Sequence, residues 1–147
     1  MFEVASGSLA IDATVPQVVG WDPPTGARDV RPDYPITLLF SKPMNMTATN
    51  PAVQLCEVGG GCLATLTFRW DSSATLLTVG HPATGFAPGK TYRAIVTTAA
   101  RDAAGNQVPV PRYVWPDCPA AMADCAFASS FVVPSSASSV DATAPPY

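Results

Sequence analysis

The stretch Ile36-Thr37-Leu38-Leu39-Phe40-Ser41-Lys42-Pro43-Met44 decides the fold. Ile36, Leu38 and Phe40 occupy every second position, so they share one face of an extended chain. A strand with a single apolar face turns that face toward the core, and we expect these three side chains to be buried. Pro43 cannot donate a backbone hydrogen bond to a neighbouring strand, so the strand ends before it. The stretch therefore predicts one strand of a β-sheet.

Similar short apolar runs with the same alternation occur on both sides of this stretch. Groups of Pro, Gly, Asp, Asn and Ser separate the runs, as is typical of tight turns between strands. No segment has the length and periodicity of a normal helix. The pattern predicts an all-β sandwich of about seven strands. We expect these strands at residues 17–21, 36–41, 52–57, 63–70, 75–79, 91–98 and 126–133.

The four cysteines form two close pairs, Cys56 with Cys62 and Cys118 with Cys125. An even number at short spacing predicts two disulfides, and thus an extracellular or cell-surface location, with the periplasm as an alternative. Three pairings are possible. We expect the local one, because the three glycines at 59–61 let the chain turn back between the first two cysteines. The first pair would then close a hairpin between the third and fourth expected strands.

Composition and charge exclude several classes of partner. Hydrophobic residues make up 48% of the 147-residue chain and charged residues only 13%. Lysine occurs twice, as Lys42 and Lys90, and the net charge is −3, so we expect no binding of nucleic acid or insertion into a membrane. No apolar run reaches the roughly 18 residues that a membrane-spanning helix needs. The first residues lack the pattern of a signal peptide, and we expect any signal peptide to lie outside this segment.

The two ends of the chain have the composition of linkers. Residues 1–15 and 134–147 are rich in Ser, Ala, Thr and Pro, which predicts a single domain at 16–133 between two linkers. Ile11-Asp12-Ala13-Thr14-Val15-Pro16 recurs as Val140-Asp141-Ala142-Thr143-Ala144-Pro145. One interpretation is coincidence in sequence of low complexity. The other, which we favour, is that the same interdomain joint stands on both sides of one module in a tandem array.

Several phrases, taken in their order along the chain, resemble a known family. They are Pro16-x-Val18, Pro23-Pro24-Thr25-Gly26-Ala27-Arg28-Asp29-Val30, the stretch at 36–44, Pro88-Gly89-Lys90-Thr91-Tyr92, Asp102-Ala103-Ala104-Gly105-Asn106 and Ser129-Ser130-Phe131. This order resembles the bacterial Ig-like domains of the S-layer protein type, the SbsA-like modules. The resemblance implies an immunoglobulin-like Greek-key β-sandwich, used as a repeated building block in surface-layer proteins, adhesins and secreted hydrolases, with no catalytic residues. The cysteine pairs and a proline-rich insertion at 107–125 depart from the family pattern.

Polar side chains that could carry chemistry are few. His81 is the only histidine and no nucleophile motif accompanies it, so we expect neither an enzyme nor a cofactor. Asp102, Asp117 and Asp124 would supply calcium ligands if the late loops met, but the chain has no D-x-D-x-D-G run. The simpler prediction is that Asp102 caps its own turn. The two cysteine pairs lack the C-x-x-C spacing of a zinc site.

A crosslink between lysine and asparagine side chains is a further hypothesis. It would join Lys42 to Asn106, or Lys90 to Asn45. Such a bond needs a buried lysine whose amine is neutral beside an acid. Disulfides already supply covalent bracing, so we do not expect it.

The insertion carries the candidate binding residues, Tyr113 and Trp115. Aromatic residues in a stapled loop on a rigid scaffold suit a patch that binds a glycan or a protein. The competing interpretation is a lid that folds over the open end of the sandwich.

The first functional hypothesis is a non-catalytic structural or adhesive spacer whose partners are neighbouring domains of the same polypeptide. The alternative is an accessory module of an extracellular enzyme or adhesin that binds a ligand through residues 107–125.

Overall fold

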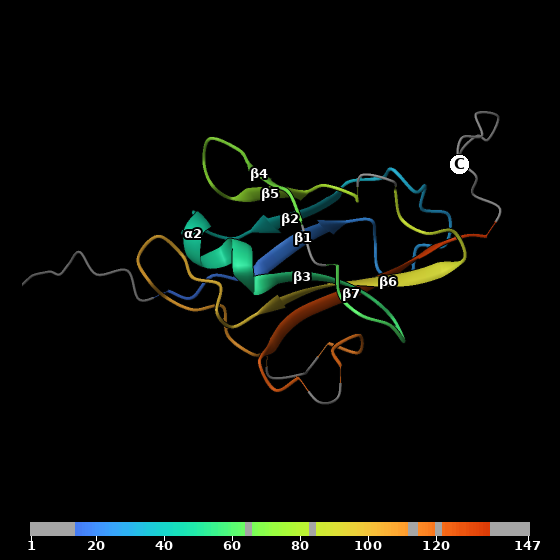
Figure 1. Ribbon diagram of the computed structural model, residues 1–147. Helices are drawn as coiled ribbons and strands as arrows, with labels where there is room; N and C mark the ends of the chain where they lie inside the picture. The colour runs from blue at the N-terminus through green and yellow to red at the C-terminus, as the bar shows by residue number, and fades with distance from the viewer. Residues whose placement is uncertain (1–13, 64–65, 83–84, 112–114, 120–121, 136–147) are drawn as a thin grey trace, which may run out of the picture.

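The chain folds into two antiparallel β-sheets that pack face to face (Figure 1). The structure is a computed structural model, and it describes residues 14–63, 66–82, 85–111, 115–119 and 122–135. One sheet has the strand order β1-β2-β5-β4 and the other has β3-β6-β7. This is the order of an immunoglobulin domain of the constant type. The predicted all-β, immunoglobulin-like sandwich of seven strands is confirmed.

The strands agree closely with the expected ones, except for the fourth. The four-stranded sheet contains β1 (Val18–Asp22), β2 (Ile36–Phe40), β5 (Leu76–Val79) and β4 (Phe68–Trp70). The three-stranded sheet contains β3 (Val53–Glu57), β6 (Lys90–Thr97) and β7 (Cys125–Val133). Between β2 and β3 lie a short helix α2 (Met46–Thr49) and a 3₁₀ turn η1 (Asn50–Ala52). None of the helices in the described part of the chain is long and apolar enough to cross a membrane.

The alternation in β2 places its apolar face in the core, as predicted. Ile36, Leu38 and Phe40 are all buried there. Tyr92 of β6 is buried too, and its hydroxyl oxygen accepts a hydrogen bond at 2.8 Å from the backbone N–H of Ala87. A tyrosine that binds the backbone a few residues upstream in this way is a recurrent brace of immunoglobulin-like sandwiches. The core is thus closed at this corner by a satisfied polar group.

The predicted hairpin between residues 52–57 and 63–70 forms only at its closing turn, and the expected pairing of the two strands along their length is wrong. The backbones of Cys62 and Cys56 form an isolated β-bridge, and the N–H of Leu63 donates to the carbonyl of Leu55 at 2.9 Å. The chain then reaches the other sheet, where β4 begins only at Phe68 and pairs with β5. The reason is packing, because Trp70 stacks on Phe40 of that sheet with ring centroids 5.8 Å apart.

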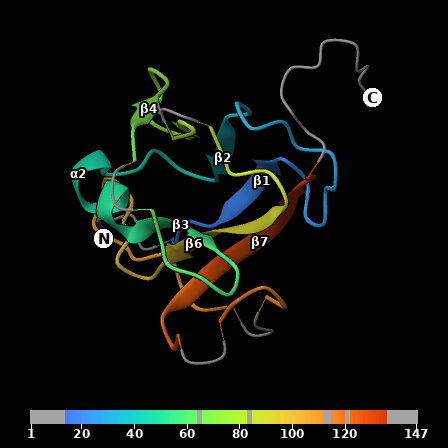
Figure 2. The ribbon, with the colours of Figure 1, turned by 45° about the vertical axis from the view of Figure 1, so that its right-hand side comes forward.

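The first and last described residues lie at opposite ends of the sandwich (Figures 1 and 2). Lys42 contacts Thr14 at the N-terminal end, whereas at the C-terminal end the N–H of Gly89 donates to the carbonyl of Val133 at 2.7 Å. Strand β6 runs between the two ends, and its 8 residues span about 27 Å. The chain therefore passes through the module from one end to the other.

Candidate functional site

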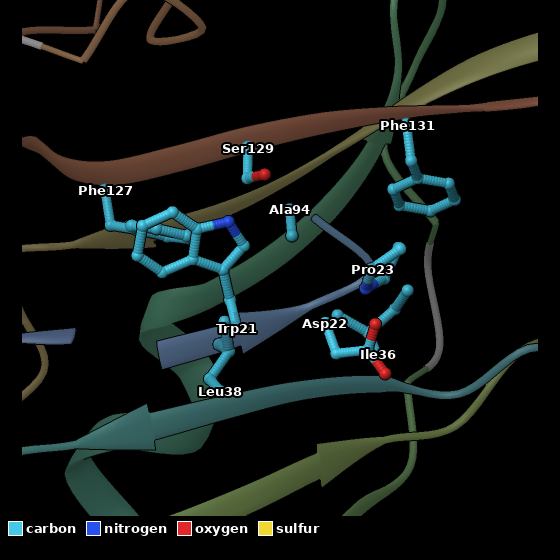
Figure 3. A pocket seen from close by; sticks show the side chains of 9 residues that line it. All are labelled: Trp21, Asp22, Pro23, Ile36, Leu38, Ala94, Phe127, Ser129 and Phe131. Carbon is cyan, nitrogen blue, oxygen red and sulfur yellow. The ribbon is translucent and has the colours of Figure 1, made fainter. Parts of the chain in front are cut away.

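A small cavity lies between the two sheets, beside β1 and β7 (Figure 3). The rings of Trp21 and Phe127 point toward one another on one side of it, and Phe131 lies on the other. Its volume of about 10 Å³ has room for about one water molecule. Sites for sugars and other organic ligands have volumes of several hundred Å³. This cavity therefore cannot hold such a ligand.

Trp115, the predicted binding residue of the insertion, packs against the core. Its ring lies 5.3 Å from that of Trp21 and 5.0 Å from that of Phe127, both edge to face. Such pairs contribute about 1 kcal/mol beyond the area they bury. Trp115 is only partly exposed, a position that fits the lid interpretation. Tyr113 lies outside the described residues, and a ligand-binding role for these two residues stays a prediction.

The described part of the insertion continues along β7 and covers the outer face of the three-stranded sheet. The Asp117 carboxylate accepts a hydrogen bond at 2.8 Å from the N–H of Ser130. Beyond it, Cys118 and Met122 pack on a second, smaller apolar cluster. The buried members of this cluster are Cys56, Ile95, Cys125 and Ala128. Sequence reasoning missed this second layer, although the continuous apolar run in β6 is a sign of burial on both faces.

Both disulfides have the predicted local pairing. Cys56 is bonded to Cys62, and Cys118 to Cys125. Cys56 and Cys125 both belong to the second apolar cluster, so the two disulfides brace the same side of the module. The second one closes the loop that covers this side.

Residues 36–44 and 102–106, two of the stretches that resemble the family, contact each other at the N-terminal end of the sandwich. The Lys42 amine lies 2.7 Å from a carboxylate oxygen of Asp102, whose side chain is 1% exposed. The other carboxylate oxygen accepts the N–H of Asn106 at 2.8 Å, so the predicted role of Asp102 as a turn cap is confirmed. Burial acts to raise the pKa of Asp102. The hydrogen bonds from Lys42 and Asn106, together with the Lys42 charge, outweigh burial and lower this pKa to about 2.

This electrostatic environment disfavours the crosslinks considered above. Lys42 pairs with an ionised carboxylate, which stabilises the charged ammonium and not the neutral amine that attack on Asn106 would need. The other pair does not meet. Lys90 contacts Glu57 at the C-terminal end, whereas Asn45 caps α2 and accepts the N–H of Ala48 at 3.0 Å.

The remaining polar candidates are dispersed. No three Asp, Glu, His or Cys side chains gather as metal ligands among the described residues. Asp102 and Asp117 are held by the contacts given above, so the structure does not bring them and Asp124 together as calcium ligands. The ring of His81 is exposed, and its Nδ1 atom lies 2.7 Å from the carbonyl oxygen of the adjacent Pro82.

Comparison with known proteins agrees with this fold. A family model described as a bacterial Ig-like domain matches residues 12–116, and the match ends inside the insertion, before β7. A crystal structure of the S-layer protein SbsC is similar at 18% identity and a TM-score of 0.51, over 82% of this chain and 14% of that one. CopC from Methylosinus trichosporium OB3b is similar at 13% identity and a TM-score of 0.57, over 81% of this chain and 93% of CopC.

At these identities the likeness to solved structures shows the fold alone. The chain spans about a seventh of the length of the S-layer structure that it resembles. The S-layer match is to SbsC, so the narrower prediction of an SbsA-like module is not confirmed. No curated protein matches the chain.

Proposed function

This chain belongs to the bacterial Ig-like domain family, and from that premise we propose that it is a non-catalytic spacer module of a secreted or cell-surface bacterial protein. The observation that carries the proposal is the placement of the first and last described residues at opposite ends of the sandwich (Figure 1). Modules built in this way can be joined in line, each adding its own length to the array. The two disulfides fit an oxidising location outside the cytoplasm.

The hydrogen bonds beside β7 support a mechanical role. Residues 26–30 run parallel to β7 and are joined to it by three backbone hydrogen bonds. The Gly26 N–H donates to the Ser130 carbonyl at 2.8 Å, and the Val132 N–H donates to the Ala27 carbonyl at 2.7 Å. The third bond, from the Val30 N–H to the Val132 carbonyl, is 3.2 Å long. A pull on the two chain ends acts along these strands, so the bonds are loaded together and not one after another.

The size of the cavity and the position of His81 support a non-catalytic function. The cavity between the sheets is too small for an organic substrate, and His81 lies exposed away from the core. The alternative of a ligand-binding module rests on the insertion. Trp115 uses its ring against Trp21 and Phe127, which leaves less of it for a ligand. We therefore place the spacer function first.

Single-molecule stretching tests this function. The full chain is held by its two termini in one experiment, and by its N-terminus and Asp124 in the other. Asp124 directly precedes β7, so the second geometry peels β7 from the sheet and breaks its bonds one after another. We expect a clearly higher unfolding force in the first geometry. Equal forces would contradict a load-bearing role. Binding of the chain to an immobilised bacterial surface glycan, lost in Trp115→Phe without loss of stability, would instead favour the ligand-binding function.

A further inference from the structure

Lys42 joins the segment that precedes β1 to the end of the sandwich. Its amine donates a hydrogen bond to the Thr14 carbonyl at 2.6 Å and lies 2.7 Å from the Asp102 carboxylate. Its side chain is 15% exposed. Because a charged donor in a mostly buried position makes a strong and directional contact, Lys42 fixes the place of the Thr14 carbonyl. We call residues 14–17 the leading segment.

The groups that hold Lys42 are themselves held. The Ala103 N–H donates to the Pro43 carbonyl at 2.9 Å, and the Asn45 N–H donates to the Arg101 carbonyl at 2.9 Å. These two bonds tie the residues after Lys42 to those around Asp102. The lysine and its carboxylate are therefore positioned before the leading segment binds.

The leading segment is attached at further points. The Gln17 N–H donates to the Ser41 hydroxyl at 2.9 Å, and the Ser41 N–H donates back to the Gln17 carbonyl at 2.8 Å. Pro16 between these contacts is buried. Thr14 and Gln17 are thus both fixed to the end of β2, and together they set the direction in which the chain approaches the module.

The residues fixed in this way are those that recur at the other end of the chain. In the repeat, Thr143 takes the place of Thr14 and Pro145 that of Pro16, each 129 residues later (143 − 14 and 145 − 16). The Asp-Ala-Thr that ends at this threonine is identical in both copies. If the threonine is needed to bind the lysine, and the proline to fill its buried position, the same residues are expected wherever such a module begins.

We propose that Lys42 and Asp102 form a clamp that fixes the leading segment, and that residues 143–145, which match residues 14–16, belong to the leading segment of a second Ig-like module that follows in the same polypeptide. This proposal rests on the proposed spacer function and adds its partner and its joint. It requires a lysine about 28 residues after Thr143 (42 − 14) and an Asp-x-x-Gly-Asn turn that begins about 88 residues after it (102 − 14). A full-length sequence without these residues would overturn the second part.

Nuclear magnetic resonance on the full chain tests the clamp. Lys42→Met removes the donor and the charge but keeps the stem, and Lys90→Met is the matched control because Lys90 also contacts a carboxylate, Glu57, at 3.3 Å. We expect Lys42→Met to increase the motion of the Thr14 and Val15 amides and to leave β6 unchanged. Lys90→Met should leave Thr14 and Val15 as they are, and Lys42→Arg should restore most of the order. Unchanged motion in Lys42→Met, or equal changes in both methionine variants, would overturn the clamp.

A fusion of two copies tests the joint. Residues 1–145 are followed directly by residues 17–147 of a second copy, so that Thr143 stands where Thr14 would. We expect small-angle X-ray scattering to give an extended particle, and Lys42→Met in the second copy to make it flexible, whereas the same change in the first copy has no effect. If the particle stays extended with Lys42→Met in either copy, the clamp is overturned and the spacer function is left intact. A flexible unmodified fusion would contradict the spacer function, and the amide motions then decide on the clamp separately.

Discussion

The two sheets bury their inner faces alike, but their outer faces differ. On the four-stranded sheet, Leu39 and Leu76 face one another across β2 and β5 and are 41% and 37% exposed. On the three-stranded sheet, Ile95 and Ala128 face one another across β6 and β7 and are each 1% exposed. All four are apolar residues on outward positions of paired strands. The difference comes from the insertion, whose disulfide-closed part lies over the second pair.

This contrast shows that burial of an outward position depends on what the rest of the chain places over it. The insertion adds a third layer to one side of a two-layer sandwich. If that is correct, apolar residues under the insertion contribute to stability like core residues, and those on the bare sheet contribute little. Each of the following predictions tests whether the region covered by the insertion differs from the rest of the sandwich in this way.

The largest effect is expected at Ile95. Ile95→Ala removes buried methyl groups and leaves a cavity under the insertion, so we expect a loss of about 3 kcal/mol in the free energy of unfolding. Leu39→Ala, on the bare sheet, should change it by less than about 0.5 kcal/mol. Urea denaturation measures both. Equal losses would show that the insertion is not part of the folded core.

The next effect is expected for the second disulfide. Replacing Cys118 and Cys125 by Ala frees a short loop in the unfolded chain, which costs about 2.5 kcal/mol on the chain-entropy model. Hydrogen exchange at the Ile95 and Ala128 amides should also become faster, because the cover is released. The matched variant, with Cys56 and Cys62 replaced by Ala, should lose a similar free energy. If it accelerated these amides as much, the cover would not depend on the second disulfide.

A third prediction separates the N-terminal end from the insertion. The pKa of Asp102 is lowered from 3.8 to about 2, so its contribution of about 2 kcal/mol is complete above pH 3.8 and is lost as the pH falls through about 2. Asp102→Asn should lose about this amount at pH 7 and remove the part of the dependence between pH 4 and pH 2 that Asp102 contributes. Exchange at Ile95 and Ala128 should become faster by no more than the loss of global stability accounts for. A larger acceleration there would mean that the two regions are coupled.

The smallest effect is expected at Asp117. Its carboxylate accepts the Ser130 N–H at the edge of β7, and Asp117→Ala should cost about 1 kcal/mol and expose this amide to exchange. Asp124→Ala, for which no such contact is observed, is the matched variant in the same loop and should have less effect. Calorimetric melting of the two variants compares them. A larger loss for Asp124→Ala would place the attachment of the insertion elsewhere.

Local contacts were predictable from the sequence. Alternation identified the buried face of β2, and the spacing of four residues between Asp102 and Asn106 identified the turn cap. The local pairing of the cysteines followed from their short separations. In each case the interacting groups are near in the chain, so backbone geometry alone brings them together.

The tertiary structure decided the rest. The third and fourth strands went to different sheets, because Trp70 packs on Phe40 and not on the strand that precedes it. Lys42 and Asp102 are 60 residues apart (102 − 42) and meet only because their two loops close the same end of the sandwich. Ile95 alternates like any outward residue, and only the folded insertion removes it from water. Alternation indicates which residues share a face, but what covers that face depends on where distant segments pack.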